Sequence, residues 1–158
     1  MIAISNFEVI TTLPLSYFFV EKSTSMDQAE IGAAMGNGFQ QVYTYLMTAG
    51  VAPTGAALSV YTSPPGDGLN FHVGFGVSQS DLDKAGGGVS GAILPAQQAI
   101  RYLHKGPYAG LGAVYGEIQK HLDDTGLACT GQSWEIYLND PSTAAPEDLE
   151  TEVFMPVA

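Results

Sequence analysis

The sequence has little positive charge. Its 158 residues include 5 Lys and Arg against 16 Asp and Glu, so the formal net charge at pH 7 is −11. The basic residues form no cluster along the chain; they are Lys22, Lys84, Arg101, Lys105 and Lys120. Because such a chain repels phosphate backbones, we expect no direct binding to nucleic acid. An acidic protein attracts cations instead.

Cysteine and long hydrophobic runs are also scarce. The single cysteine, Cys129, excludes an internal disulfide framework and a multi-cysteine metal site. The chain has no Walker A loop, no dinucleotide-binding fingerprint and no zinc-protease motif, so we expect neither a metal nor a cofactor. No apolar run is long enough to span a bilayer, and the N-terminus lacks the basic region of a secretory signal. These absences favour a cytoplasmic protein that does not bind membranes.

An internal repeat is the most informative pattern in the chain. The segment Gly50-Val51-Ala52-Pro53-Thr54-Gly55 recurs as Gly126-Leu127-Ala128-Cys129-Thr130-Gly131, and further matches follow in the same order. Each half begins with a β-rich segment that a Leu-Pro pair interrupts, and a helix and two strands follow. We therefore predict repeat 1 at about 5–78, a glycine-rich linker at about 79–91, and repeat 2 at about 92–158.

Apolar residues at helical spacing predict one helix in each repeat. The two stripes are Ile31, Met35, Phe39, Val42 and Leu46, and Leu111, Val114, Tyr115, Ile118 and Leu122. Gly50 and Gly126 follow them, where a left-handed helix cap forms. The pattern predicts an α+β fold of duplicated β-α-β-β units with pseudo-twofold symmetry, in which both helices cover one side of an antiparallel sheet.

The strand near 132–139 carries the candidate binding residues. We expect Trp134 to face the helices, which leaves Glu135 and Tyr137 on the other side. The repeat adds Tyr61 at the position equivalent to Tyr137, and the neighbouring strands add His72 and Glu152. A solvated sheet face is the alternative interpretation. Aromatic walls around one carboxylate are what a site for an organic cation requires.

Three segments together resemble the GyrI-like family. They are Arg101-Tyr102-Leu103-His104-Lys105-Gly106-Pro107-Tyr108, which contains an H-x-G-x-Y motif, Trp134-Glu135-Ile136-Tyr137-Leu138-Asn139-Asp140-Pro141, and Thr151-Glu152-Val153-Phe154-Met155-Pro156-Val157. The resemblance implies one effector-binding domain over 1–158, similar to those of AraC-type and MerR-type transcription regulators, with a central ligand cleft. It also implies that Glu135 recognises cationic or polar ligands.

The resemblance leaves three functions open. The first is a stand-alone, multidrug-type module that binds a lipophilic or cationic small molecule through Glu135, Tyr137, Tyr61, His72, Trp134 and Glu152. The second is a hydrolase that opens cyclopropane rings of reactive natural products, in which Glu135 activates water and Tyr137 steadies the leaving oxygen. The third is a gyrase-inhibitor-like protein that acts on a macromolecular partner. The sequence also leaves a homodimer open.

Overall fold

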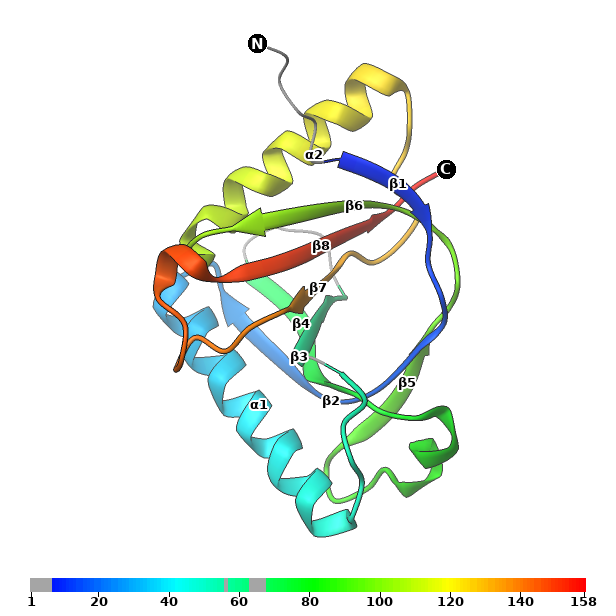
Figure 1. The fold of residues 1–158 in the computed structure, drawn as a ribbon, viewed down its shortest axis with the longest axis vertical. Coiled ribbons are helices and arrows are strands. Elements are labelled where there is room, and N and C mark those ends of the chain that lie inside the picture. The colour runs from blue at the N-terminus through cyan, green and yellow to red at the C-terminus, as the bar shows by residue number, and fades with distance from the viewer. Residues whose placement is uncertain (1–6, 56, 63–67) are drawn as a thin grey trace. The chain divides into compact units, whose positions relative to one another are not determined.

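Within the residues that the structure describes, the chain forms two compact units, each with four antiparallel strands and one long helix (Figure 1). The computed structural model describes residues 7–55, 57–62 and 68–158. Unit 1 comprises residues 1–12 and 96–158, and unit 2 comprises residues 13–95. The α+β class and the antiparallel strand pairing agree with the prediction from the sequence.

Unit 2 pairs its strands in the order β3-β4-β2-β5. Its elements are β2 (Leu15–Ser25), α1 (Gln28–Ala49), β3 (Ala57–Tyr61), β4 (Gly68–Gly76), the 3-10 helix η1 (Gln79–Lys84) and β5 (Ser90–Leu94). The side chain of Asp27 caps the start of α1, and Gly50 ends it with φ 70°. Val42 and Leu46 of α1 are buried against Phe18 of β2, which fixes the helix on one face of these strands.

Unit 1 pairs its strands in the order β1-β6-β8-β7. Its elements are β1 (Phe7–Thr11), β6 (Gln98–Lys105), the 3-10 helix η2 (Tyr108–Gly110), α2 (Leu111–Thr125), β7 (Trp134–Tyr137), the 3-10 helix η3 (Pro146–Asp148) and β8 (Glu150–Pro156). Val114, Ile118 and Leu122 form the predicted stripe of α2 and are buried against Ile100 and Val153.

Both units have the same β-α-β-β order of elements. The short strand that precedes each of these orders in the sequence, however, pairs with the first strand of the other one. β1 precedes β2 in the sequence and pairs with β6, whereas β5 precedes β6 and pairs with β2. Pro14 and Pro95 lie in the short connections where the chain passes from one unit to the other. The observed units therefore differ from the predicted repeats: residues 1–12 group with the second half, and the predicted linker contains η1 and the start of β5.

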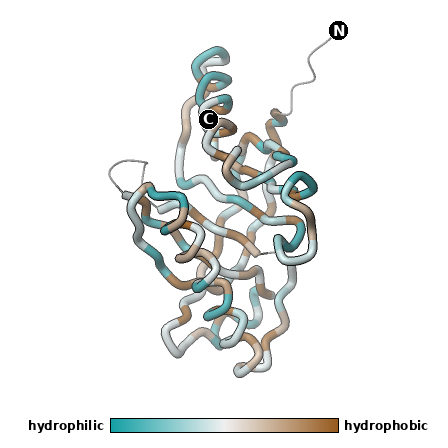
Figure 2. The backbone as a smooth tube through the Cα atoms, turned by 90° about the vertical axis from the view of Figure 1, so that its left-hand side faces the viewer, coloured by the Kyte–Doolittle hydropathy of each residue, from teal (hydrophilic) through white to brown (hydrophobic). Residues whose placement is uncertain are grey.

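Hydrophobic and hydrophilic residues alternate along the backbone, so no long hydrophobic segment stands out (Figure 2). Within the described residues, neither long helix is apolar enough over its length to cross a membrane.

The glycine in the middle of β4 is required by close packing of the backbone. Gly74 pairs with Phe19 of β2 and with Leu58 of β3. A Cβ atom at this position would overlap the carbonyl oxygen of Phe18 and would lie 2.9 Å from the Cα of Phe19. Because both of these atoms are backbone, only a shift of the strands could make room.

We expect Gly74→Ala to lower the free energy of unfolding by about 2 kcal/mol or more, measured by urea denaturation. Gly32→Ala in α1 is the matched control, since a Cβ there meets nothing within 4 Å. The control should stabilise the protein by up to about 1 kcal/mol, because alanine is the better helix former. Equal stability of Gly74→Ala and the wild type would contradict this view of the β2–β4 pairing.

Candidate ligand-binding site

Glu135 lies on the helix-covered face of unit 1. In the pairing of β7 with β8, Glu135 stands opposite Val153. Val153 belongs to the same buried cluster as Val114 of α2, so its side of the sheet is the one that α2 covers. The expectation that Trp134 faces the helix and Glu135 faces away is therefore wrong. The alternation was correct, but its direction is reversed.

Two tyrosine hydroxyls hold the carboxylate of Glu135. Tyr115 of α2 donates a hydrogen bond to Oε2 over 2.7 Å, and Tyr137 of β7 donates one to Oε1, also over 2.7 Å. Glu135 is 1% exposed and Tyr137 is 8% exposed. Burial of a carboxylate is costly unless hydrogen bonds stabilise it, and hydrogen bonds to a charged acceptor are the strong ones. These two hydroxyls supply that stabilisation.

The H-x-G-x-Y motif builds the turn that brings a third tyrosine to this site. The ring Nε2 of His104 donates to the carbonyl oxygen of Pro107 over 3.0 Å, and the amide of Gly106 donates to the carbonyl of Leu149 over 2.8 Å. Gly106 has φ 133°, a conformation that side chains disfavour. The turn leads into η2, where the ring of Tyr108 packs edge-on against Tyr137 at a centroid distance of 5.6 Å.

Two carboxylates act on the hydroxyl of Tyr108. Burial raises the pKa of the Tyr108 hydroxyl, and the negative charges of Asp140 and Glu135 raise this pKa further. Two carboxylates therefore act on one aromatic ring at this end of unit 1. Such a field stabilises a cation next to the ring and destabilises an anion.

Thr151 also belongs to this face. It stands opposite Tyr137 in the β7–β8 pairing, and it is fully buried at 0% exposure. Its hydroxyl oxygen has no hydrogen-bond partner among the described residues.

Two predicted site residues of unit 1 lie on the opposite face of its sheet. Trp134 stacks on Phe154 of β8 with ring centroids 5.1 Å apart. Glu152 forms an ion pair with Nε of Arg101, and Arg101 also approaches Glu8 at 3.4 Å. Glu152 is therefore a charge-balanced residue and does not join Glu135 and Tyr137.

The two predicted residues of unit 2 also lie on different faces of their sheet. Tyr61 packs with Phe71 against the residues of α1. His72, the next residue along β4, points to the other side, where its ring stacks on Phe19 at 3.7 Å and its Nδ1 lies 2.9 Å from the hydroxyl of Tyr17. The structure does not bring Tyr61 and His72 together.

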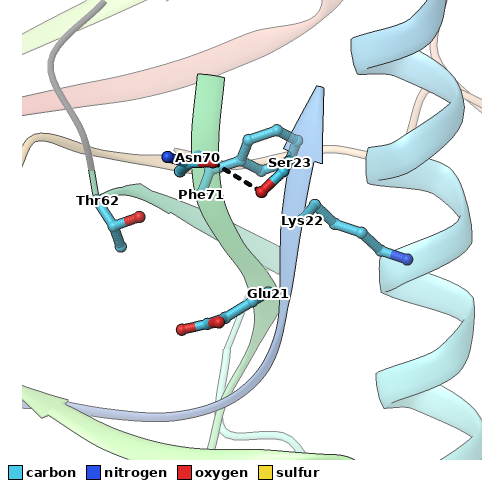
Figure 3. Close-up of a pocket in the computed structure, with 6 residues that line it drawn as sticks. All are labelled: Glu21, Lys22, Ser23, Thr62, Asn70 and Phe71. Atoms are coloured by element: carbon cyan, nitrogen blue, oxygen red, sulfur yellow. Dashed lines mark hydrogen bonds between the residues drawn. The ribbon is translucent and has the colours of Figure 1, made fainter. Parts of the chain in front are cut away.

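A surface hollow of unit 2 lies along the paired strands β2 and β4, next to the residue that follows β3. It is lined by Glu21, Lys22, Ser23, Thr62, Asn70 and Phe71 (Figure 3). Glu21 and Lys22 point in opposite directions, and Ser23 donates a hydrogen bond to Asn70 over 2.7 Å. None of the predicted site residues lines this hollow, so it is not the predicted site.

Sequence reasoning missed three residues around Glu135. Tyr115 was assigned to the apolar stripe of the helix, and Tyr108 was noted only as part of a motif. A hydroxyl within an apolar stripe is the signal that could have revealed Tyr115, since buried tyrosine hydroxyls usually have a partner. Thr151 gave no signal, because threonine is common in strands.

Comparison with known proteins agrees with this fold. A family model described as GyrI-like small molecule binding domain matches residues 5–158. The crystal structure of the EcmrR C-terminal domain superimposes with a TM-score of 0.83 at 18% identity, with 96% of each chain covered. A comparison with curated proteins finds no match.

Two further solved structures share the fold at lower similarity. SAV2435 bound to tetraphenylphosphonium has a TM-score of 0.66 at 12% identity, covering 96% of this chain and 93% of that one. A hydrolase encoded by lin2189 from Listeria innocua has a TM-score of 0.62 at 16% identity, covering 96% of this chain and 91% of that one.

We expect Tyr115→Phe to lower the free energy of unfolding by about 1.5–3 kcal/mol, because it removes a hydrogen bond from a buried charged group. Tyr102→Phe is the matched control, since its hydroxyl binds Glu117 on the exposed surface over 3.2 Å. The control should change stability by less than about 1 kcal/mol, as urea denaturation of both variants will show. Equal losses in the two variants would mean that burial adds nothing to the Tyr115–Glu135 bond.

His72 predicts a pH dependence of stability. Burial lowers its pKa below the usual 6.5, and the nearby Glu21 carboxylate opposes this only in part. The unfolded chain therefore binds more protons than the folded one as the pH falls through 6.5, so His72 makes the folded state less stable below that pH. His72→Gln should flatten the fall of stability between pH 7 and pH 5. An unchanged slope in the variant would show that other groups cause the fall.

Proposed function

The chain belongs to the family of GyrI-like small-molecule-binding domains, and we propose that it binds lipophilic organic cations at Glu135. The observation that carries this proposal is the buried carboxylate of Glu135, held by Tyr115 and Tyr137 and followed outward by the ring of Tyr108. The carboxylate supplies the opposite charge, and the aromatic faces supply cation–π attraction and apolar surface.

The site favours a cation over an anion or a neutral molecule. Asp140 and Glu135 both act on Tyr108, and the chain as a whole carries a net charge of −11. Attraction by the whole chain raises the local concentration of cations, and the buried carboxylate then holds one of them. The low exposure of Glu135 strengthens this interaction, because charges attract more strongly away from water.

Binding requires movement of side chains around the carboxylate. Glu135 is 1% exposed, so a ligand reaches it only when a tyrosine hydroxyl gives up its hydrogen bond. The cation then replaces that hydroxyl beside the carboxylate, and the exchange keeps the buried charge stabilised. Tyr137, which is itself buried against Tyr108, is the side chain that we expect to move.

Two solved structures with this fold are relevant to the proposal. SAV2435 was solved with tetraphenylphosphonium, a lipophilic cation. EcmrR was solved in a complex with DNA, and its C-terminal domain has the fold of this chain. Both are under 25% identical to this chain, so the proposal of a cationic ligand for this chain rests on the Glu135 site.

We expect tetraphenylphosphonium to raise the melting temperature of the protein, since a ligand at a hundred times its Kd adds about 2.7 kcal/mol of stability. Glu135→Gln keeps the side-chain shape and removes the charge, so the Kd measured by calorimetry should rise at least about tenfold, or roughly 1.4 kcal/mol.

Glu152→Gln is the matched control for this measurement. It also removes one carboxylate from unit 1, but from the opposite face of the sheet, where Arg101 balances it. The control should bind with nearly the affinity of the wild type. Equal losses of affinity in both variants would mean that the overall charge of the chain, and not the position of Glu135, causes the effect. Binding of anions in place of cations would contradict the proposal.

A hydrolase is the second candidate function, favoured by the likeness to the Listeria innocua hydrolase and by the hydroxyl–carboxylate pair of Tyr137 and Glu135. In such an enzyme Glu135 would take a proton from water, and a tyrosine hydroxyl would stabilise the leaving oxygen. Turnover of a reactive cyclopropane by the wild type, lost in Glu135→Gln while an unreactive analogue still binds, would favour this candidate over a module that only binds.

A further inference from the structure

The hydroxyl of Thr151 is a buried polar group that lacks a hydrogen bond among the described residues. Thr151 is 0% exposed, so water does not reach this hydroxyl from the surface. An unsatisfied buried hydroxyl costs about 1–3 kcal/mol, and most such groups in proteins have a partner. A valine would fill the same space without this cost. The position therefore keeps a polar group that folding of unit 1 does not need.

Thr151 and Glu135 lie on the same face, on either side of Tyr137. Thr151 stands directly opposite Tyr137 across the β7–β8 pair, and Glu135 is two residues from Tyr137 on β7. Directly opposed residues have Cβ atoms about 4.5–5.5 Å apart, and diagonal neighbours about 7–8 Å apart. A small polar group of a ligand that displaces the Tyr137 hydroxyl thus comes within reach of both residues.

We propose that Thr151 is the second polar contact of the site and that it selects ammonium ligands with at least two N–H groups. This inference rests on the proposed function. One N–H donates to the carboxylate of Glu135, and another donates to Oγ1 of Thr151. The apolar substituents of the nitrogen then pack against Tyr108 and Tyr137. The preferred ligands are lipophilic primary and secondary amines in their protonated form, and fully substituted onium ions bind by charge alone.

A matched pair of cations tests the selection. Dibenzylammonium carries two N–H groups, whereas dibenzyldimethylammonium carries the same charge and the same rings with no N–H. Calorimetry at pH 7 should show tighter binding of dibenzylammonium to the wild type. Thr151→Val removes the hydroxyl and keeps the shape, so it should weaken dibenzylammonium about tenfold, the size of one hydrogen bond, and leave dibenzyldimethylammonium unchanged.

Two control variants separate the hydroxyl from packing. Thr151→Ser keeps the hydroxyl and loses the methyl group, so it should keep the preference for dibenzylammonium. Thr24→Val removes another buried threonine hydroxyl, in unit 2, where it donates to the carbonyl of Ser25, and should leave both affinities as they are. Thr151→Val should fold at least as well as the wild type, because it removes an unsatisfied polar group.

The outcomes distinguish the inference from the function on which it rests. If both cations bind and Thr151→Val weakens them equally or not at all, the selection by Thr151 is overturned and cation binding stands. If Thr151→Ser loses the preference as fully as Thr151→Val, packing explains it and the inference is also overturned. If neither cation binds the wild type or Thr151→Val, the proposed function itself fails.

Discussion

The antiparallel register of β7 on β8 is the constraint on which the Glu135 site depends. It places Glu135 opposite Val153 and Tyr137 opposite Thr151, on the face that α2 covers. Side chains alternate along a strand, so a shift of one residue would move all of them to the other face. Trp134 would then lie under α2, and the carboxylate would lose the hydroxyl of Tyr115. The hydrogen bonds and the register therefore stabilise each other.

Local patterns in the sequence predict the elements of this fold well. The stripe that contains Val114 and Ile118 is buried as expected, and Gly50 and Gly126 both end helices with positive φ. The direction in which β7 faces was not predictable from alternation, because both of its sides are buried. Trp134 is 3% exposed and Glu135 is 1% exposed. Hydrophobicity assigns the tryptophan to the core, but the hydroxyls of Tyr115 on α2 and of Tyr137 on the same strand stabilise the glutamate as the helix-facing residue.

For a different reason, local patterns could not predict which strands pair when they lie far apart in the sequence. Nothing in Phe7–Thr11 distinguishes a partner in β2 from one in β6, because both are antiparallel strands with suitable apolar residues. The prediction grouped β1 with the first repeat, since neighbours in sequence usually pair. The Leu-Pro pairs at both crossings were the available signal. They were interpreted as interruptions within strands, and the chain instead changes units there.

The exchanged strands also affect how the chain folds while it is being made. Unit 2 is one continuous stretch, residues 13–95, whereas unit 1 needs residues from both sides of it. Domains fold as units during synthesis, from the N-terminal end. Unit 2 can therefore pair its four strands before β6, β7 and β8, the other strands of unit 1, have been synthesised. The tyrosines and the carboxylate of the Glu135 site all follow residue 95, so this site forms last, after unit 2 has folded.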